Sequence, residues 1–165
     1  MTTTDSTTET VMFGAGCFWG VQQRFDALPG VRSTEVGYAD GTTEHPTYQE
    51  VCTGATGHTE VVKVDYDPAT VSIDDLLTAF FEMHNPTLKD RQGPDVGTQY
   101  RSAVYWSTDA QREATASKIA AIDGTGRWGR PIVTEVAEAG PFWRAEEYHQ
   151  KYNEKNGRAA CPTGI

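Results

Sequence analysis

Cys17 is the residue of this sequence with the strongest signs of chemical reactivity. It follows a short apolar stretch, Val11–Phe13, and a flexible turn, Gly14–Gly16, and it begins an expected helix. A thiol at a helix N-terminus lies near partial positive charge and unpaired backbone N–H groups, and both lower its pKa and favour the thiolate. The pattern predicts a nucleophile. The open alternative is a buried structural cysteine.

Glu60 is the candidate proton donor. It begins a strand expected over Thr59–Asp67, on the same face as Val62, Val64 and Tyr66. A carboxyl group on an apolar face loses hydration, which raises its pKa and keeps it protonated near neutral pH. The alternative is a solvated strand end from which Glu60 points into water.

Aromatic residues accompany both groups. Phe18 and Trp19 are consecutive, so they cannot both face one core stripe, and one of them is expected to line an opening that grips a methyl-sized group. Tyr48 and Tyr100 lie in or beside long irregular segments, where a phenol can donate a hydrogen bond while its ring lines a pocket. Core packing is the alternative for all four rings.

Three further residues carry weaker signals. Asp95, within Gly93–Gly97, suits either a site or a turn in which it bonds its own backbone. Cys161 lies near the C-terminus, where a thiol on a mobile tail can reach a second sulfur for disulfide exchange; an incidental exposed cysteine is the alternative. Cys52 occupies an apolar position of a short turn and is interpreted as structural.

The elements that must position these residues alternate along the chain. Apolar spacing and start signals such as Ser72–Asp75 predict strands at 11–13, 31–39, 59–67, 99–106 and 132–137, and helices at 17–28, from 72 onwards, 109–122 and 145–156, with a helical turn at 48–52. The long loop 85–98 is a candidate functional segment. The order β-α-β-β-α-β predicts an α+β fold, a ferredoxin-like split βαβ two-layer sandwich with an additional C-terminal helix and tail.

Length and composition predict one globular domain. The chain has 165 residues, of which 38% are hydrophobic and 22% charged. Residues 1–9 are polar and are expected to form a disordered lead, 10–156 a single catalytic domain, and 157–165 a tail carrying Cys161. We expect a monomer.

Charge and motif content exclude several classes of function. The net charge of −9 makes nucleic acid and anionic membrane poor partners, and no apolar run is long enough to span a bilayer. The four histidines are scattered without metal-ligand spacing, and no glycine motif indicates a nucleotide or flavin, so no metal or bound cofactor is expected. Three cysteines and no signal peptide favour the reducing cytoplasm.

The stretch Gly16–Gly20, which reads GCFWG, resembles the signature of the peptide methionine sulfoxide reductase A family. Further blocks similar to that family follow in the same order at 37–41 (GYADG), 46–60 (PTYQEVCTGATGHTE), 84–87 (HNPT), 91–102 (RQGPDVGTQYRS) and 142–152 (FWRAEEYHQKY). Several motifs in order are far more specific than any one of them. The tail, where Ala159–Pro162 reads AACP, is not a close match.

The resemblance implies an α+β enzyme that repairs oxidative damage by reducing the S epimer of methionine sulfoxide, free or in proteins. Cys17 would be the nucleophile, and Phe18 and Trp19 would hold the substrate methyl group. The groups around the sulfoxide oxygen would be Glu60, Tyr48 and Tyr100, with Asp95 lining the site.

The resemblance also implies a cysteine cycle. Attack by Cys17 on the sulfoxide sulfur, with a proton from Glu60, would leave a sulfenic acid on Cys17. Cys161 would condense with it to a disulfide, which an external dithiol such as thioredoxin would reopen. Cys52, or direct attack by an external thiol, remains an alternative to Cys161.

Two other functions remain open. A cysteine hydrolase would need a histidine base beside Cys17, for which His58 and His149 are candidates. A non-catalytic redox sensor would use a switch disulfide between Cys17 and Cys161. The aromatic pair after Cys17 argues against both, because neither chemistry requires a methyl-sized pocket.

Overall fold

A computed structural model of the chain describes residues 8–92 and 95–152. The elements are, in order, β1 (Glu9–Ala15), α1 (Phe18–Asp26), β2 (Val31–Ala39), α2 (Tyr48–Cys52), β3 (Thr59–Tyr66), α3 (Ile73–Glu82), β4 (Arg91–Gln92), β5 (Asp95–Val96), the 3-10 turn η2 (Thr98–Tyr100), β6 (Ser102–Trp106), α4 (Asp109–Thr125), β7 (Glu135–Glu138), β8 (Phe142–Arg144) and the 3-10 turn η3 (Glu147–His149). Within this part of the chain, no helix is both long enough and apolar enough to cross a membrane.

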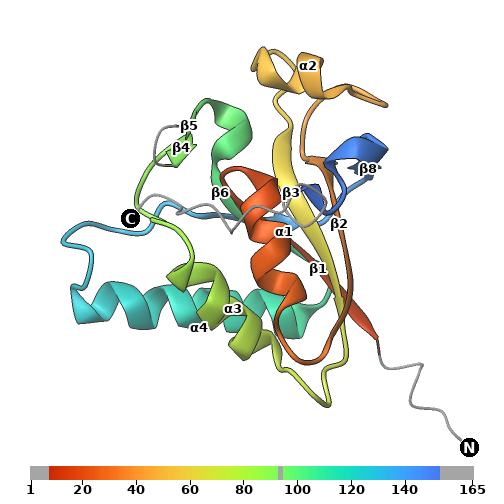
Figure 1. Cartoon of the computed structure of the whole chain (residues 1–165). Coiled ribbons are helices and arrows are strands. Elements are labelled where there is room, and N and C mark those ends of the chain that lie inside the picture. Colours follow the sequence, from red (N-terminus) through yellow and green to blue (C-terminus); the bar gives the residue numbers. More distant parts are fainter. Residues whose placement is uncertain (1–7, 93–94, 153–165) are drawn as a thin grey trace, which may run out of the picture.

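The strands form a six-stranded sheet in the order β7-β6-β1-β3-β2-β8, with β4 and β5 as a separate pair (Figure 1). β1 pairs antiparallel with both β3 and β6, and β2 pairs antiparallel with both β3 and β8. Only β6 and β7 are parallel among the pairs of the described residues. Helices and a largely antiparallel sheet together confirm the predicted α+β class.

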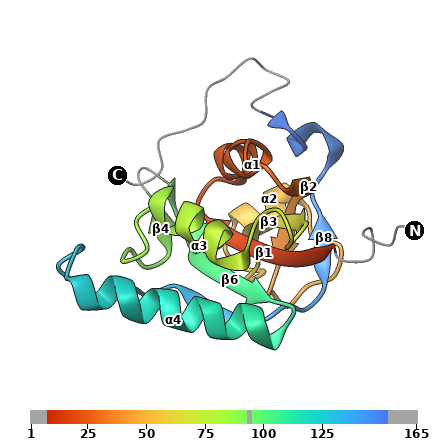
Figure 2. The same ribbon diagram turned by 90° about the horizontal axis from the view of Figure 1, so that it is seen from below.

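Three helices cover one face of the sheet. Phe18, Val21 and Phe25 of α1 share a buried apolar core with Leu76 and Phe80 of α3. Side chains of α4 pack against the same cluster, and Figure 2 shows α3 and α4 side by side. The short α2 lies at the end of the sheet away from α4 (Figure 1). The face predicted for β3 is therefore its buried face.

Local sequence signals account for the helix starts. The backbone N–H of Asp75 donates to Ser72 Oγ at 3.0 Å, and the N–H of Ser72 donates to Asp75 Oδ2 at 3.2 Å, so the predicted capping box opens α3. Thr47 caps α2 and Thr108 caps α4 in the same way.

The structure differs from the sequence expectation in several elements. The strands β4, β5 and β8 were not predicted, and two predicted elements change. Residues 98–100 form the turn η2, so the strand predicted from residue 99 begins at Ser102. The helix predicted over 145–156 does not form over residues 145–151, where residues 147–149 form η3; Tyr152, the last residue before the undescribed tail, is helical. The reason is long-range: the Gln150 side chain accepts from the Val36 N–H and donates to the Val36 carbonyl, holding this segment against the edge of β2. Residues 1–7 of the lead predicted over 1–9 lie outside the described residues, as does the tail with Cys161, whereas Glu9, also expected in the lead, begins β1.

Candidate active site

The predicted site residues gather where β1 ends and where β3 and β6 begin. Ala15, the last residue of β1, pairs with Ser102, the first residue of β6. β3 runs antiparallel to β1, so its first residues, Thr59 and Glu60, lie at the same end of the sheet. The topology thus brings the segments of Cys17, Glu60 and Tyr100 together.

Cys17 is the N-cap residue of α1 and is half-buried. The turn before it depends on Gly16, which has a φ of +92° and would place a Cβ 2.9 Å from the Cβ of Gln92. Only glycine adopts this conformation without strain and allows this close approach. The sulfur therefore lies at the start of the helix, where backbone N–H groups lack partners within the helix.

Glu60 is buried, with 1% of its surface exposed. One carboxyl oxygen, Oε1, accepts from the backbone N–H of Phe18 at 3.4 Å. The other, Oε2, is buried and has no partner among the described residues. Burial raises the pKa of Glu60 to about 8. The Phe18 hydrogen bond opposes this shift, and the nearby Asp95 charge adds a smaller upward contribution. The burial predicted from the sequence is confirmed, and it favours a protonated Glu60 at neutral pH.

Tyr48 and Tyr100 approach the same place from α2 and η2. Burial, followed by the charge of Glu60, raises the pKa of both phenols, so each remains a neutral hydrogen-bond donor. Charges on Asp95 and Cys17 also raise the pKa of Tyr100, so Glu60, Asp95 and Cys17 all lie within electrostatic range of its hydroxyl. Asp95 is half-buried in β5, and burial raises its pKa.

Cys52 differs from its sequence interpretation. It is exposed, so the expectation of a structural cysteine is wrong. Partial burial of the thiol, with a smaller contribution from the charge of Glu60, raises the pKa of Cys52, and hydrogen bonding to Tyr48 and Tyr100 opposes this shift. The spacing to Tyr48 was an available signal, since residues four apart in a helical turn share a face.

The two aromatic residues after Cys17 differ in exposure. Phe18 is buried, with its ring centroid 6.4 Å from that of Tyr48, whereas Trp19 is half-buried. The ring of His149 lies next to both, at 5.4 Å from Phe18 and 5.7 Å from Trp19. From the sequence, His149 is a candidate only for a base. No local pattern predicts this contact, because 130 residues separate His149 from Trp19.

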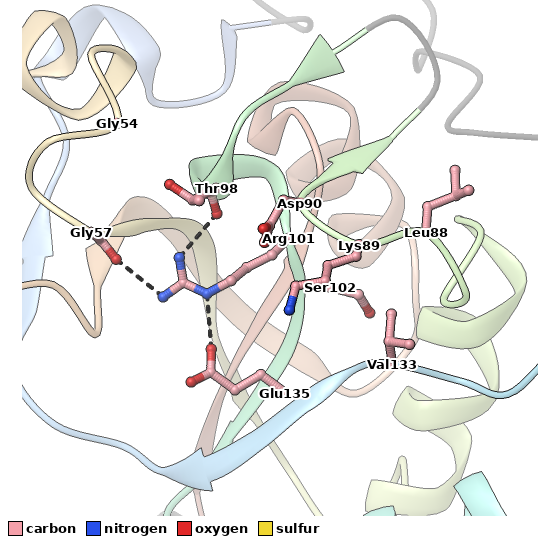
Figure 3. A pocket seen from close by; sticks show the side chains of 10 residues that line it. All are labelled: Gly54, Gly57, Leu88, Lys89, Asp90, Thr98, Arg101, Ser102, Val133 and Glu135. Atoms are coloured by element: carbon pink, nitrogen blue, oxygen red, sulfur yellow. Dashed lines mark hydrogen bonds and ion pairs between the residues drawn. The ribbon is translucent and has the colours of Figure 1, made fainter.

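A separate cavity of about 570 Å³ opens beyond η2 (Figure 3). Arg101 extends into it, and its guanidinium donates to the carbonyls of Thr98 and Gly57 and to Glu135 (Figure 3). None of the residues predicted from the sequence lines this cavity. The candidate chemistry at Cys17 therefore lies outside this cavity.

The two histidines considered as bases for Cys17, His58 and His149, have hydrogen-bond partners of their own. His58 Nδ1 accepts from the Gly41 N–H at 3.0 Å, and its Nε2 lies 2.7 Å from the Thr43 carbonyl. His149 Nδ1 accepts from Trp19. Both candidates of the hydrolase hypothesis are thus engaged elsewhere. Among residues 8–92 and 95–152, no cluster of three or more His, Cys, Asp or Glu side chains is placed to hold a metal ion.

Comparison with known proteins gives consistent matches along the chain. A family model described as peptide methionine sulfoxide reductase matches residues 9–165. Peptide methionine sulfoxide reductase MsrA of Methanoculleus marisnigri is 56% identical over 156 residues, which cover 94% of each chain. Among solved structures, methionine sulfoxide reductase A of Corynebacterium diphtheriae is similar with a TM-score of 0.83 and 42% identity, over 94% of this chain and 78% of that one.

A solved complex has the same fold. Mxr1 from Saccharomyces cerevisiae in complex with Trx2 matches with a TM-score of 0.64 and 23% identity, over 100% of this chain and 94% of that one.

Proposed function

The chain belongs to the peptide methionine sulfoxide reductase family, and on this premise we propose that Cys17 and Glu60 reduce the S epimer of methionine sulfoxide. The family reaction, conversion of methionine sulfoxide to methionine, makes the chain an oxidoreductase. One observation carries the assignment of residues: a buried carboxyl group with a pKa of about 8 contacts the residue directly after the N-cap cysteine.

Substrate binding uses both sides of the site. Phe18 and Trp19 hold the methyl group on the sulfoxide sulfur, a role that suits their aromatic surfaces. The sulfoxide oxygen is a strong acceptor, and Tyr48, Tyr100 and Glu60 supply neutral donors to it. Their raised pKa values support this assignment, since an ionised phenol or carboxylate could not donate. Asp95 lines the site beside Tyr100.

The first chemical step transfers the oxygen. The Cys17 thiolate forms a bond to the sulfoxide sulfur while Glu60 gives its proton to the sulfoxide oxygen. The S–O bond of the substrate then breaks and releases hydroxide. Hydroxide attacks Sγ of Cys17 and breaks the new bond between Sγ and the methionine sulfur. Methionine leaves reduced by two electrons, and Cys17 is oxidised by two electrons to a sulfenic acid.

Regeneration of Cys17 requires a second thiol. We assign this role to Cys161, which condenses with the sulfenic acid to form a disulfide and release water. An external dithiol of the thioredoxin type then reduces the disulfide, by analogy with the yeast complex. Cys52 is the alternative resolving thiol within the chain. Its thiol is exposed, which is compatible with such a role.

Further assignments concern the fold class, the domain organisation, the oligomeric state and the cellular compartment. The central strands β6-β1-β3-β2 have the order and antiparallel pairing of a ferredoxin-like split βαβ sandwich, which supports that assignment. We assign residues 10–156 to one catalytic domain that acts as a monomer. A cycle driven by external dithiols suits the reducing cytoplasm.

Turnover of a single epimer tests the proposal. The full chain, given dithiothreitol and separated epimers, is expected to convert methionine S-sulfoxide and not the R epimer. Cys17→Ser should lose this activity, whereas Cys52→Ser serves as the matched control and should retain it with dithiothreitol. Full activity of the Cys17→Ser protein would remove the proposed nucleophile. Oxidation of Cys17 by peroxide without any sulfoxide turnover would favour the redox sensor instead.

A further inference from the structure

The indole of Trp19 is held by a hydrogen bond at its edge. Its Nε1–H donates to Nδ1 of His149 at 3.0 Å, with the ring planes 27° apart. Tyr152 also stacks on the indole, at 3.8 Å between centroids and 12° between planes. His149 itself is 1% exposed and packs 4.4 Å from the Tyr48 ring. The polar edge of Trp19 is thus tied to a buried group.

The chain segment that carries His149 is fixed on both sides. Before it, Glu146 accepts from the hydroxyl of Tyr38 at 2.9 Å and from the N–H of Tyr48 at 3.0 Å. After it, Gln150 bonds to both backbone groups of Val36. These contacts join the segment to β2 and α2, so the acceptor offered to Trp19 has a defined position.

The identity of the acceptor fixes the protonation of His149. An indole N–H is only a donor, so Nδ1 must carry a lone pair and the ring proton of a neutral imidazole is on Nε2. Nε2 is buried and has no partner among the described residues. A buried donor without an acceptor destabilises a fold, and an apolar side chain would avoid that loss. Packing alone therefore does not account for a histidine here, whereas its acceptor at Nδ1 does.

We propose that His149 is a positioning residue that fixes the indole of Trp19 and thereby limits the substrate to a methyl-sized group on sulfur. The inference rests on the proposed function, in which Phe18 and Trp19 hold that methyl group. The hydrogen bond restrains the side-chain torsions of Trp19, so the space beside Phe18 keeps its width. Without the acceptor the indole can rotate, and larger alkyl groups fit about as well as methyl.

Three variants at one position separate the hydrogen bond from packing. His149→Phe keeps a ring of similar size but has no acceptor, and His149→Leu provides a second apolar replacement if the phenylalanine variant fails to fold. His149→Asn keeps an acceptor near the place of Nδ1 and loses the ring. Each is assayed with methionine S-sulfoxide and with ethionine S-sulfoxide, which has one more methylene on sulfur, using dithiothreitol as reductant.

The expected result is a loss of discrimination. His149→Phe should raise the KM for methionine S-sulfoxide by about 3- to 10-fold, the usual effect of one lost hydrogen bond, with a smaller change in kcat. Its preference for methionine over ethionine sulfoxide in kcat/KM should fall by a similar factor, and His149→Asn should restore most of both. In a Trp19→Phe background, which lacks the donor, the His149→Phe change should have little further effect.

Unchanged KM and preference in the folded His149→Phe or His149→Leu protein would overturn the positioning role, as would full additivity with Trp19→Phe. Such results would leave the proposed function standing, provided that the wild-type protein turns over methionine S-sulfoxide and Cys17→Ser does not. Failure of the wild-type turnover itself would instead refute the function.

Discussion

The backbone N–H of Phe18 donates to Oε1 of Glu60 at 3.4 Å, so one peptide group connects the buried acid to the helix that Cys17 caps. This contact engages one carboxyl oxygen and leaves Oε2 buried without a partner among the described residues. The proton of a neutral Glu60 is therefore available at the oxygen that no backbone group occupies. The proposed acid catalysis by Glu60 therefore depends on where α1 begins.

Replacement of Glu60 by glutamine should slow the reaction without disturbing the site. The amide oxygen can still accept from Phe18, but the amide does not release a proton to the sulfoxide oxygen. We expect the rate of sulfenic acid formation to fall on the order of 10²-fold or more, measured in single-turnover experiments. Glu35→Gln is the control. Glu35 lies on β2, away from Cys17, and forms ion pairs with Arg144 and Lys63. An unchanged rate in Glu60→Gln would exclude the proton-donor role.

The raised pKa of Glu60 also predicts a pH dependence of stability. The folded chain keeps a proton up to about pH 8, while an unfolded chain releases it near the ordinary value of 4.5. Stability contributed by the neutral group is therefore complete below the unfolded pKa and is lost as the pH rises through the folded pKa. Glutamine does not titrate, so the stability of Glu60→Gln relative to wild type should rise between pH 5 and pH 8.5.

Denaturant unfolding of both proteins at these two pH values measures the effect. The relative gain should exceed about 1.4 kcal/mol, the free energy equivalent to one pKa unit. Other titrating groups are common to both proteins and cancel in the difference. An equal difference in unfolding free energy at both pH values would contradict a buried, protonated Glu60.

Much of the fold was predictable because its signals are local. The two-residue alternation of Val62, Val64 and Tyr66 defines β3, and the Ser72 capping box defines the start of α3. The segment 145–152 was not predictable in this way. Its conformation depends on the bonds between Gln150 and Val36, which are 114 residues apart in the sequence. The local pattern of residues 145–152 predicts a helix, but the segment packs against the edge of β2.

The candidate site also combines residues that local signals predict with residues whose positions depend on long-range contacts. The burial of Glu60 follows from its own strand, and the position of Cys17 follows from the glycine turn before it. The contacts of Cys52 and His149 with the site depend on how α2 and η3 pack on the sheet. From its residue type alone, Cys52 was therefore interpreted as a structural cysteine, and His149 was considered only as a base for a hydrolase.

Replacement of Cys161 should allow the first reduction of the sulfoxide but prevent the regeneration of Cys17. If Cys161 resolves the sulfenic acid, Cys161→Ser reduces about one equivalent of methionine S-sulfoxide per chain and then stops when thioredoxin is the reductant. Mass spectrometry should find the sulfenic acid on Cys17. Cys52→Ser, its matched control, should continue to turn over. Continued turnover of Cys161→Ser, together with arrest of Cys52→Ser, would transfer the resolving role to Cys52.

Gly16→Ala should disable the site through the backbone. The residue has a φ of +92°, and its added Cβ would meet the Cβ of Gln92 at 2.9 Å, so both the conformation and the contact oppose a side chain. We expect a destabilisation of about 1–3 kcal/mol and a marked loss of turnover, because relief of this strain moves Cys17 away from Glu60. Gly124→Ala is the matched control, since no atom lies within 4 Å of a Cβ there and alanine favours the helix. The control should be as stable as wild type or more so, with full activity. If Gly16→Ala were to unfold at the wild-type denaturant midpoint and keep wild-type turnover, the turn would not position the nucleophile.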